Sequence, residues 1–244
     1  MKNSLNKSQI ERFSRQLILK NIGPKGQKKI LLSKVLVVGI GGLGCPAAEN
    51  LVRAGIGTIG LVDNDIVNLS NIHRQSLFDT KDVKKPKVSV AAKRLNKINP
   101  LTRIETYKSR LDEKNIEKII KNYEIIIDGS DNFKTKFLIN DCCMRLKKKL
   151  ITAAISKFDG HIFTFDFKDK KTASLKNFYQ EKEISEDILN CEFEGVLGTT
   201  ASIVGTTQAN EALKMIVKIG QNLKNQILII DLLNLNFRKV KFKK

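Results

Sequence analysis

The sequence predicts an α/β fold, a doubly wound Rossmann-like sheet that is mostly parallel and ends in antiparallel C-terminal strands. Three observations support this prediction. Apolar runs typical of buried strands alternate with helical segments over residues 35–155. A glycine-rich turn connects the first of these runs to the next helix. Beyond this region polar and apolar residues alternate over 161–167, which is typical of an antiparallel strand.

Each element is predicted from its own pattern. The run 35–38 is apolar throughout, as expected for a strand that is covered on both faces. The segment 11–20 has an apolar side and indicates an amphipathic helix, whereas the glycines and proline of 21–26 indicate a turn. The predicted strands are 35–38, 58–62, 103–107, 124–128, 150–155, 161–167, 226–231 and 236–241. The predicted helices are 11–20, 45–54, 87–98, 115–121, 133–146 and 199–219.

The whole chain, residues 1–244, is predicted to be a single domain. A length of 244 residues suits one large α/β domain with a modest extension. We expect an N-terminal helical arm over 1–30 and a crossover loop over about 168–195. The loop segment is polar and too long for an ordinary connection, which indicates a functional role.

Composition predicts a cytoplasmic protein without a membrane segment. Hydrophobic residues make up 41% of the chain, but no apolar stretch approaches the roughly 18 residues that span a bilayer. The N-terminus is polar, so no signal peptide is expected. None of the four cysteines forms a Cys-x-x-Cys pair, which argues against a disulfide framework.

The net charge of +19 comes from 44 lysines and arginines against 25 aspartates and glutamates. Such a charge attracts anions, including nucleotides, acidic protein tails and RNA. The basic residues are dispersed and no aromatic residues interleave them, so the pattern does not specify a nucleic-acid platform. The basic segment 238–244 alternates like an edge strand with a charged outer face.

The strongest local motif is Gly39-Ile-Gly41-Gly42-Leu-Gly44, which directly follows a predicted strand and opens a predicted helix. Its glycines permit a tight turn and let a phosphate approach the backbone, at a helix start whose N–H groups favour anions. Asp63 ends the next strand, where an acid accepts ribose hydroxyls. Together these residues predict a nucleotide site, which either NAD or ATP would fit.

Charged residues further along the chain favour ATP. Arg74 and Lys87 follow the second strand, and Asp131 follows the fourth at the carboxyl edge where such sheets bind ligands. Positive charge around a triphosphate suits an enzyme whose leaving group is pyrophosphate. A carboxylate that faces polyphosphate would hold Mg²⁺.

Six segments resemble the adenylating enzymes of the ubiquitin-activating superfamily, in particular the ThiF/MoeB/HesA family that activates sulfur-carrier proteins. The resemblance extends from about Glu11 to Lys239, in family order and spacing. The segments are Arg12-Phe-Ser-Arg15-Gln16, Gly39 to Gly44, Asp63-Asn-Asp65, Leu69-Ser-Asn71-Ile-His73-Arg74-Gln75, Pro86-Lys87 and Asp128-Gly-Ser-Asp131-Asn132.

The resemblance implies a role for each matched residue. Asp63 would accept the ribose hydroxyls, while Asn71, Arg74 and Lys87 would grip the phosphates and Asp131 would hold Mg²⁺. The implied cofactor-binding residues are Gly41, Gly42, Asp63, Ser70, Asn71, Arg74, Lys87, Asp131 and Asn132. The implied catalytic residues are Arg15, Arg74, Lys87, Asp131 and Cys191. The family works as a homodimer, in which Arg15 would reach the neighbouring subunit's site as an arginine finger.

The cysteines separate this chain from part of the family. Many sulfur-carrier activators hold a structural zinc with two Cys-x-x-Cys pairs, but residues 168–185 and the C-terminal end contain no cysteine, so no zinc is expected. Cys191 matches a crossover-loop cysteine that some members use for covalent sulfur transfer and others do not need. Both interpretations stay open. Cys45 is interpreted as a small residue in a tight turn.

The resemblance implies an ATP-dependent adenylyltransferase with Mg²⁺ that activates the C-terminal glycine of a small ubiquitin-like sulfur carrier ending in Gly-Gly and releases pyrophosphate. The pathway would be molybdopterin or thiazole (thiamine) synthesis, and a cysteine desulfurase or rhodanese would donate sulfur. Three alternatives are an enzyme that dehydrates threonylcarbamoyladenosine in tRNA, an NAD-dependent oxidoreductase and a non-catalytic partner subunit. The +19 charge favours the tRNA enzyme, whereas Arg74, Lys87 and Asp131 are unexplained in an oxidoreductase.

Overall fold

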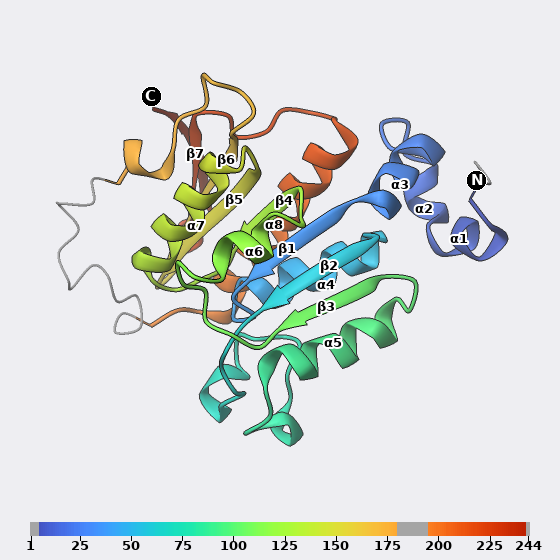
Figure 1. The fold of residues 1–244 in the computed structure, drawn as a ribbon, viewed down its shortest axis with the longest axis horizontal. Helices are drawn as coiled ribbons and strands as arrows, with labels where there is room; N and C mark the ends of the chain where they lie inside the picture. Colours follow the sequence, from blue (N-terminus) through green and yellow to red (C-terminus); the bar gives the residue numbers. More distant parts are fainter. Residues whose placement is uncertain (1–4, 180–194, 243–244) are drawn as a thin grey trace.

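The computed structural model describes residues 5–179 and 195–242, and in this part of the chain eight strands form one sheet (Figure 1). The strand order is β3-β2-β1-β4-β5-β6-β7-β8; the pairs from β3 to β5 are parallel and those from β5 to β8 antiparallel. This confirms the predicted fold class. The strands are β1 (Lys34–Val38), β2 (Thr58–Val62), β3 (Arg103–Tyr107), β4 (Ile125–Asp128), β5 (Lys149–Ser156), β6 (Asp159–Asp166), β7 (Gln226–Asp231) and β8 (Asn236–Lys241).

Helices cover both faces of the sheet. In Figure 1, α6 and α7 lie in front of the strands, and α4 and α8 lie behind them. The helices that follow the N-terminal segment are α3 (Gly23–Leu32), α4 (Gly44–Ala54), α5 (Lys87–Ile98), α6 (Ile116–Ile120), α7 (Phe133–Arg145) and α8 (Gly198–Val217). Two short helices, α1 (Lys7–Arg12) and α2 (Ser14–Leu17), precede them, and the 3₁₀ turns are η1 (Leu69–Asn71), η2 (Thr80–Asp82) and η3 (Leu175–Asn177).

The central strand β1 shows why the sheet needs two layers of helices. Val35 and Val37 pack into the core with α4, α5 and α8, whereas Leu36 and Val38 pack into the core with α6 and α7. All four side chains are at most 4% exposed. Alternate side chains of a strand point to opposite faces, so an all-apolar strand is stable only between two covering layers.

The strand order reverses between β1 and β4. The chain steps from β1 to β2 and β3 on one side, then returns to place β4 directly beside β1. The carboxyl ends of β1 and β4 therefore diverge into turns on either side of a crevice, the usual place for a ligand in such sheets. The turn after β1 is the glycine-rich segment 39–44, and the turn after β4 is 129–131.

The N-terminal arm differs from the prediction. One helix over 11–20 was expected, but α1 ends at Arg12 and α2 begins at Ser14. Phe13 between them is buried, and its ring lies where a side chain on Gly55 would be, because a Cβ there would be 2.4 Å from Phe13 Cζ. Burying this ring interrupts the helix.

The predicted turn over 21–26 is also wrong, because α3 begins at Gly23. Pro24 lies in the first turn of α3, where proline costs no hydrogen bond and its fixed φ suits the helix. The glycine and proline therefore mark a helix start. The other predicted helices and strands occur with ends that shift by at most two residues.

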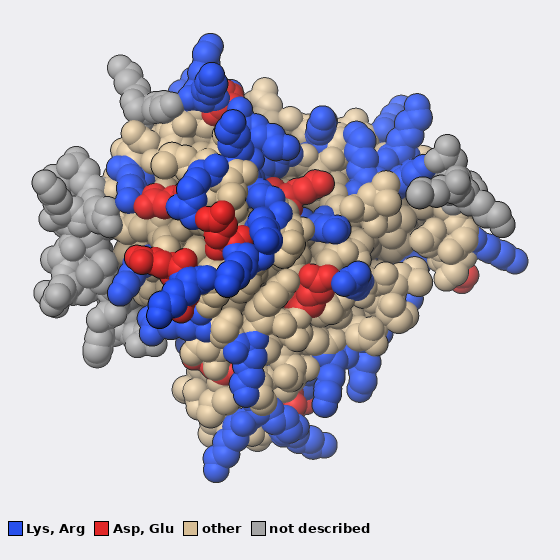
Figure 2. Space-filling view, viewed as in Figure 1, with Lys and Arg blue, Asp and Glu red and all other residues tan. Residues whose placement is uncertain are grey.

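The C-terminal hairpin forms the open end of the sheet. β8 pairs only with β7 in the described sheet, and all six of its residues are exposed, which confirms the predicted edge strand. Figure 2 shows lysine and arginine side chains spread over the face in view, with acidic side chains between them. No helix within residues 5–179 and 195–242 is long and apolar enough to cross a membrane.

The glycine-rich turn is held by close backbone packing. Gly39 has φ +80°, which favours glycine, and its N–H donates to the Val62 carbonyl at 2.8 Å. Gly44 lies against the same turn, and a Cβ there would be 1.8 Å from the Gly39 oxygen. The sequence motif is thus required by sterics at both of its ends.

Gly44→Ala is expected to lower the free energy of unfolding by about 3 kcal/mol, because the methyl group has no space beside the Gly39 carbonyl. The matched control is Gly41→Ala, whose Cβ would lie 3.6 Å from Gln75 Nε2 and make an ordinary contact. Its expected effect is below about 1 kcal/mol. Urea denaturation measures both values, and equal stabilities of the two variants would contradict the steric argument.

Candidate active site

A cavity of about 430 Å³ opens at the carboxyl ends of the parallel strands. Its wall combines the glycine turn, residues after β2, and the turn after β4. Eight of the nine predicted cofactor-binding residues line it: Gly41, Gly42, Asp63, Asn71, Arg74, Lys87, Asp131 and Asn132. Ser70 does not line the cavity. Segments that are far apart in sequence thus meet where the strand order reverses.

Asp63 is fixed against the glycine turn. Its Oδ2 accepts a hydrogen bond from the Ile40 N–H at 2.7 Å, and its Oδ1 accepts one from the Asp65 N–H at 2.8 Å. Burial raises the pKa of Asp63, while Lys87 and the same two N–H groups act in the opposite direction. The carboxylate is therefore held at the end of β2, with an orientation set by backbone atoms on both sides.

The two predicted cations, Arg74 and Lys87, face the cavity from different segments. Lys87, the first residue of α5, is 6% exposed, and its Nζ lies 3.1 Å from Asp65 Oδ2. Arg74 donates from Nη1 to the Ser70 carbonyl at 2.9 Å and lies 2.8 Å from His73 Nε2. Within the described part of the chain no carboxylate pairs with Arg74. Its guanidinium can therefore accept an anion as a partner without first releasing one.

Asn71 is buried in the 3₁₀ turn η1, where its Oδ1 accepts a hydrogen bond from the Asn68 N–H at 3.1 Å. This bond uses the acceptor of the side chain and leaves its NH₂ group to donate. Ser70 is exposed, and its contribution near the site is the backbone carbonyl that holds Arg74.

Asp131 is an exposed carboxylate in the turn after β4. Its Oδ1 accepts a hydrogen bond from Asn132 Nδ2 at 3.1 Å. Asn132 caps α7 with its own Oδ1, which accepts from the Thr135 N–H at 2.9 Å. Asn132 therefore uses both ends of its amide within the protein and orients Asp131.

The sequence reasoning assigned no role to several other polar residues of the cavity wall, among them Gln75, Arg110 and Lys136. Arg110 follows β3, and the rule that ligands bind at carboxyl ends of strands would have indicated it. Gln75 is 3% exposed, and its Oε1 has no hydrogen-bond partner among residues 5–179 and 195–242. The sequence signal for Gln75 was its place at the end of the matched segment 69–75, and that for Lys136 was its position soon after Asp131.

One predicted catalytic residue, Arg15, does not line this cavity in its own chain. Arg15 is exposed on α2, and Figure 1 shows α1 to α3 beyond the amino ends of the parallel strands, at the opposite end from the cavity. Cys191 lies outside the described residues, as does most of the predicted crossover loop. Residues 168–179 of that loop are described and contain η3.

Comparisons with known proteins identify the family. A family model described as the ThiF family matches residues 13–244. The chain is 39% identical to the sulfur carrier protein adenylyltransferase of Thermus thermophilus, over 96% of this chain and 88% of that protein. It is 38% identical to the molybdopterin-synthase adenylyltransferase of Haemophilus influenzae, over 94% and 93%. An adenylyltransferase and sulfurtransferase of Drosophila virilis is also 39% identical, but the chain spans only 53% of its length.

Solved structures agree on the fold. Escherichia coli MccB with ATP superposes with a TM-score of 0.85 at 23% identity, covering 99% of this chain and 73% of MccB. The chain belongs to the ThiF family, which confirms the predicted resemblance. Its relatives are named adenylyltransferases, which identifies it as a nucleotidyltransferase and does not favour the NAD or tRNA alternatives.

Cys45 is expected to resist alkylation in the folded protein. It is fully buried at the start of α4, and burial raises the pKa of its thiol to about 12. Only the thiolate is a good nucleophile, so little reactive form is present at pH 8. Mass spectrometry of tryptic peptides after iodoacetamide treatment should find Cys45 unmodified in native protein and modified in urea. Rapid labelling of Cys45 in native protein would contradict the buried position.

Proposed function

We propose that this protein is an ATP-dependent adenylyltransferase that activates the C-terminal glycine carboxylate of a small ubiquitin-like sulfur-carrier protein. One observation carries the proposal. A single cavity at the strand-order reversal collects a glycine turn at a helix start, the acid Asp63, the cations Arg74 and Lys87, and Asp131. The Thermus and Haemophilus relatives, named for carrier-protein and molybdopterin-synthase adenylylation, support the same assignment.

The reaction needs a nucleotide that is held and polarised. A carboxylate oxygen of the carrier forms a bond to the α-phosphorus, and the bond from that phosphorus to the bridging oxygen breaks, so pyrophosphate leaves with the electron pair. Arg74 and Lys87 stabilise the negative charge that moves onto pyrophosphate. Asp63 orients the ribose, and the N–H groups at the start of α4 face the phosphates. The protein thus supplies position and electrostatics rather than a general base.

Asp131 is the residue that would hold Mg²⁺. Within residues 5–179 and 195–242 there is no cluster of three acidic, histidine or cysteine side chains that could hold a metal alone. Magnesium at nucleotide sites usually takes one or two carboxylates plus phosphate oxygens, so a single exposed carboxylate fits. When bound, the ion would neutralise charge on the phosphates.

We further propose that the active form is a homodimer. Arg15 belongs to the predicted catalytic set but lies on the arm beyond the amino ends of the strands. A second subunit would therefore have to bring its own arm to the cavity. We place the enzyme in the cytoplasm, where ATP is available, with a cysteine desulfurase or rhodanese as sulfur donor. Molybdopterin and thiazole synthesis are the two candidate pathways.

Exchange between ATP and labelled pyrophosphate is expected only when a carrier ending in Gly-Gly is present. Asp131→Ala should reduce this exchange by about 100-fold or more, because the carboxylate that would bind the metal is lost. The matched control is Asp141→Ala, which removes a partly exposed carboxylate of α7 that pairs with Lys176 of η3. This variant should leave exchange unchanged. A wild-type rate in Asp131→Ala would rule out the assignment of this site.

Mixing two inactive variants tests the role of Arg15. Arg15→Ala and Lys87→Ala should each lose exchange activity as pure proteins. If Arg15 acts in the partner's site, each mixed dimer contains one intact site, so a scrambled equimolar mixture should recover about a quarter of wild-type activity. If Arg15 acted within its own chain, both sites of the mixed dimer would be defective and the mixture would stay inactive.

A further inference from the structure

A buried ion pair lies directly behind the turn that carries Asp131. Lys136 in the first part of α7 is 4% exposed, and Asp128 at the end of β4 is fully buried. Lys136 Nζ lies 3.2 Å from Asp128 Oδ2 and donates to the Ala153 carbonyl at 2.6 Å. Both Lys136 and Asp131 line the cavity, but Asp131 is exposed to solvent whereas Lys136 is buried.

Asp128 receives hydrogen bonds on both of its carboxylate oxygens. Oδ1 accepts from the N–H and the hydroxyl of Ser130, at 2.9 and 2.6 Å. Oδ2 accepts from the hydroxyl of Thr152 at 2.6 Å, in addition to Lys136. The backbone carbonyl of Asp128 accepts from Gln208 Nε2 of α8 at 2.9 Å. One carboxylate thus ties the turn 129–131 to β5 and α7.

This turn has little freedom on its other side. Gly129 donates its N–H to the Val38 carbonyl at 2.8 Å, and a Cβ on Gly39 would lie 2.8 Å from the Gly129 oxygen. The turn after β4 is therefore pressed against the glycine turn after β1. A shift of the turn would move Asp131 relative to the phosphates, which the glycine turn would bind.

We propose that Lys136 is a positioning residue for adenylation, which holds Asp131 in place through its ion pair with Asp128. Without the ammonium group, the buried carboxylate loses its only cationic partner among the described residues. An unpaired buried charge favours rearrangement towards solvent. The turn would then relax, and Asp131 would leave the geometry that Mg²⁺ requires. This inference rests on the proposed binding of ATP and Mg²⁺ at this cavity.

Calorimetric titration with ATP, in Mg²⁺ and in EDTA, tests the inference without using enzymatic activity. The wild type should bind ATP more tightly in Mg²⁺ than in EDTA. The Mg²⁺ gain is the ratio of the Kd for ATP in EDTA to the Kd in Mg²⁺. In Lys136→Met this gain should fall by about tenfold, as expected when a residue that orients a metal ligand is lost. Its affinity in EDTA should stay near that of wild type, and Lys136→Arg should keep the Mg²⁺ gain.

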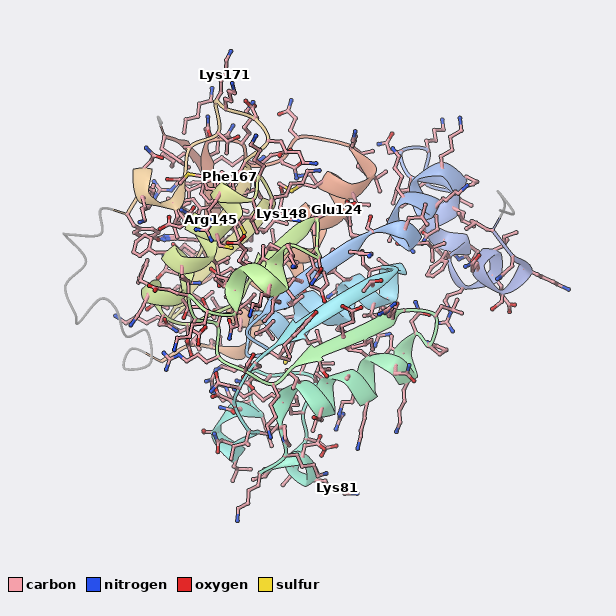
Figure 3. All side chains as sticks on the ribbon, viewed as in Figure 1. Lys81, Glu124, Arg145, Lys148, Phe167 and Lys171 are labelled. Carbon is pink, nitrogen blue, oxygen red and sulfur yellow. The ribbon has the colours of Figure 1, made fainter. Side chains whose placement is uncertain are left out.

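Lys148→Met is the matched control. Lys148 directly precedes β5, at the amino edge of the sheet, and Figure 3 shows it near Glu124 and Arg145. Its Nζ donates to the carbonyls of Lys121 and Tyr123 at 2.8 and 2.6 Å, so this variant also removes an ammonium group that binds backbone oxygen. The Mg²⁺ gain should be unchanged in it.

A double variant separates positioning from direct contact with the nucleotide. If Lys136 acts through Asp131, adding Lys136→Met to Asp131→Ala should cause no further loss of the Mg²⁺ gain. Additive losses, a reduced affinity in EDTA, or a wild-type Mg²⁺ gain in Lys136→Met would each overturn the inference. A wild type that binds no ATP, or gains nothing from Mg²⁺, would overturn the proposed function as well.

Thr152→Val provides a second test if Lys136→Met shows no unfolding transition in a thermal melt and is therefore not folded. It removes one donor to Asp128 Oδ2 and keeps the ion pair. The Mg²⁺ gain should fall in Thr152→Val too, but by less than the tenfold expected for Lys136→Met. In the Asp131→Ala background, adding Thr152→Val should cause no further loss of the Mg²⁺ gain. A Thr152→Val protein with the full Mg²⁺ gain would overturn the inference.

Discussion

The contact between two backbone turns is the constraint on which the rest of the site depends. The turn after β1 and the turn after β4 touch at Gly39 and Gly129, where no side chain fits between them. The parallel order of the strands aims both turns at the same edge of the sheet. The predicted nucleotide-binding residues that line the cavity lie in these two turns or in the segments that follow β2.

Much of this arrangement was predictable from the sequence. Apolar runs such as 125–128 indicate buried parallel strands, and the motif at Gly39–Gly44 locates the strand that starts the crevice. The rule that ligands bind at the carboxyl ends of strands then groups Asp63 and Asp131, and positive charge suited to a triphosphate adds Arg74 and Lys87. The fold class and the meeting of these segments are predictable because strand order and strand direction, rather than side-chain detail, decide which segments lie together.

The features that could not be predicted depend on tertiary packing. Phe13 breaks the expected helix because its ring occupies space beside Gly55, a residue 42 positions away, and no local pattern signals that contact. The pairing of Lys136 with Asp128 likewise depends on how α7 lies over β4 and β5. Ser70 was predicted to bind the nucleotide because it lies in a matched segment. It does not line the cavity, whereas its neighbours Asn71 and Arg74 do.

The pairing of Lys87 with Asp65 has a consequence for the protein before it meets a nucleotide. A buried ammonium group without a counterion would penalise the folded state, but Asp65 already supplies that counterion from the rim of the cavity. The folded protein therefore has a counterion for Lys87 whether or not a nucleotide is bound. In the proposed reaction a phosphate oxygen would replace the Asp65 carboxylate, whose side chain is 58% exposed, so each turnover would begin by exchanging one anion for another.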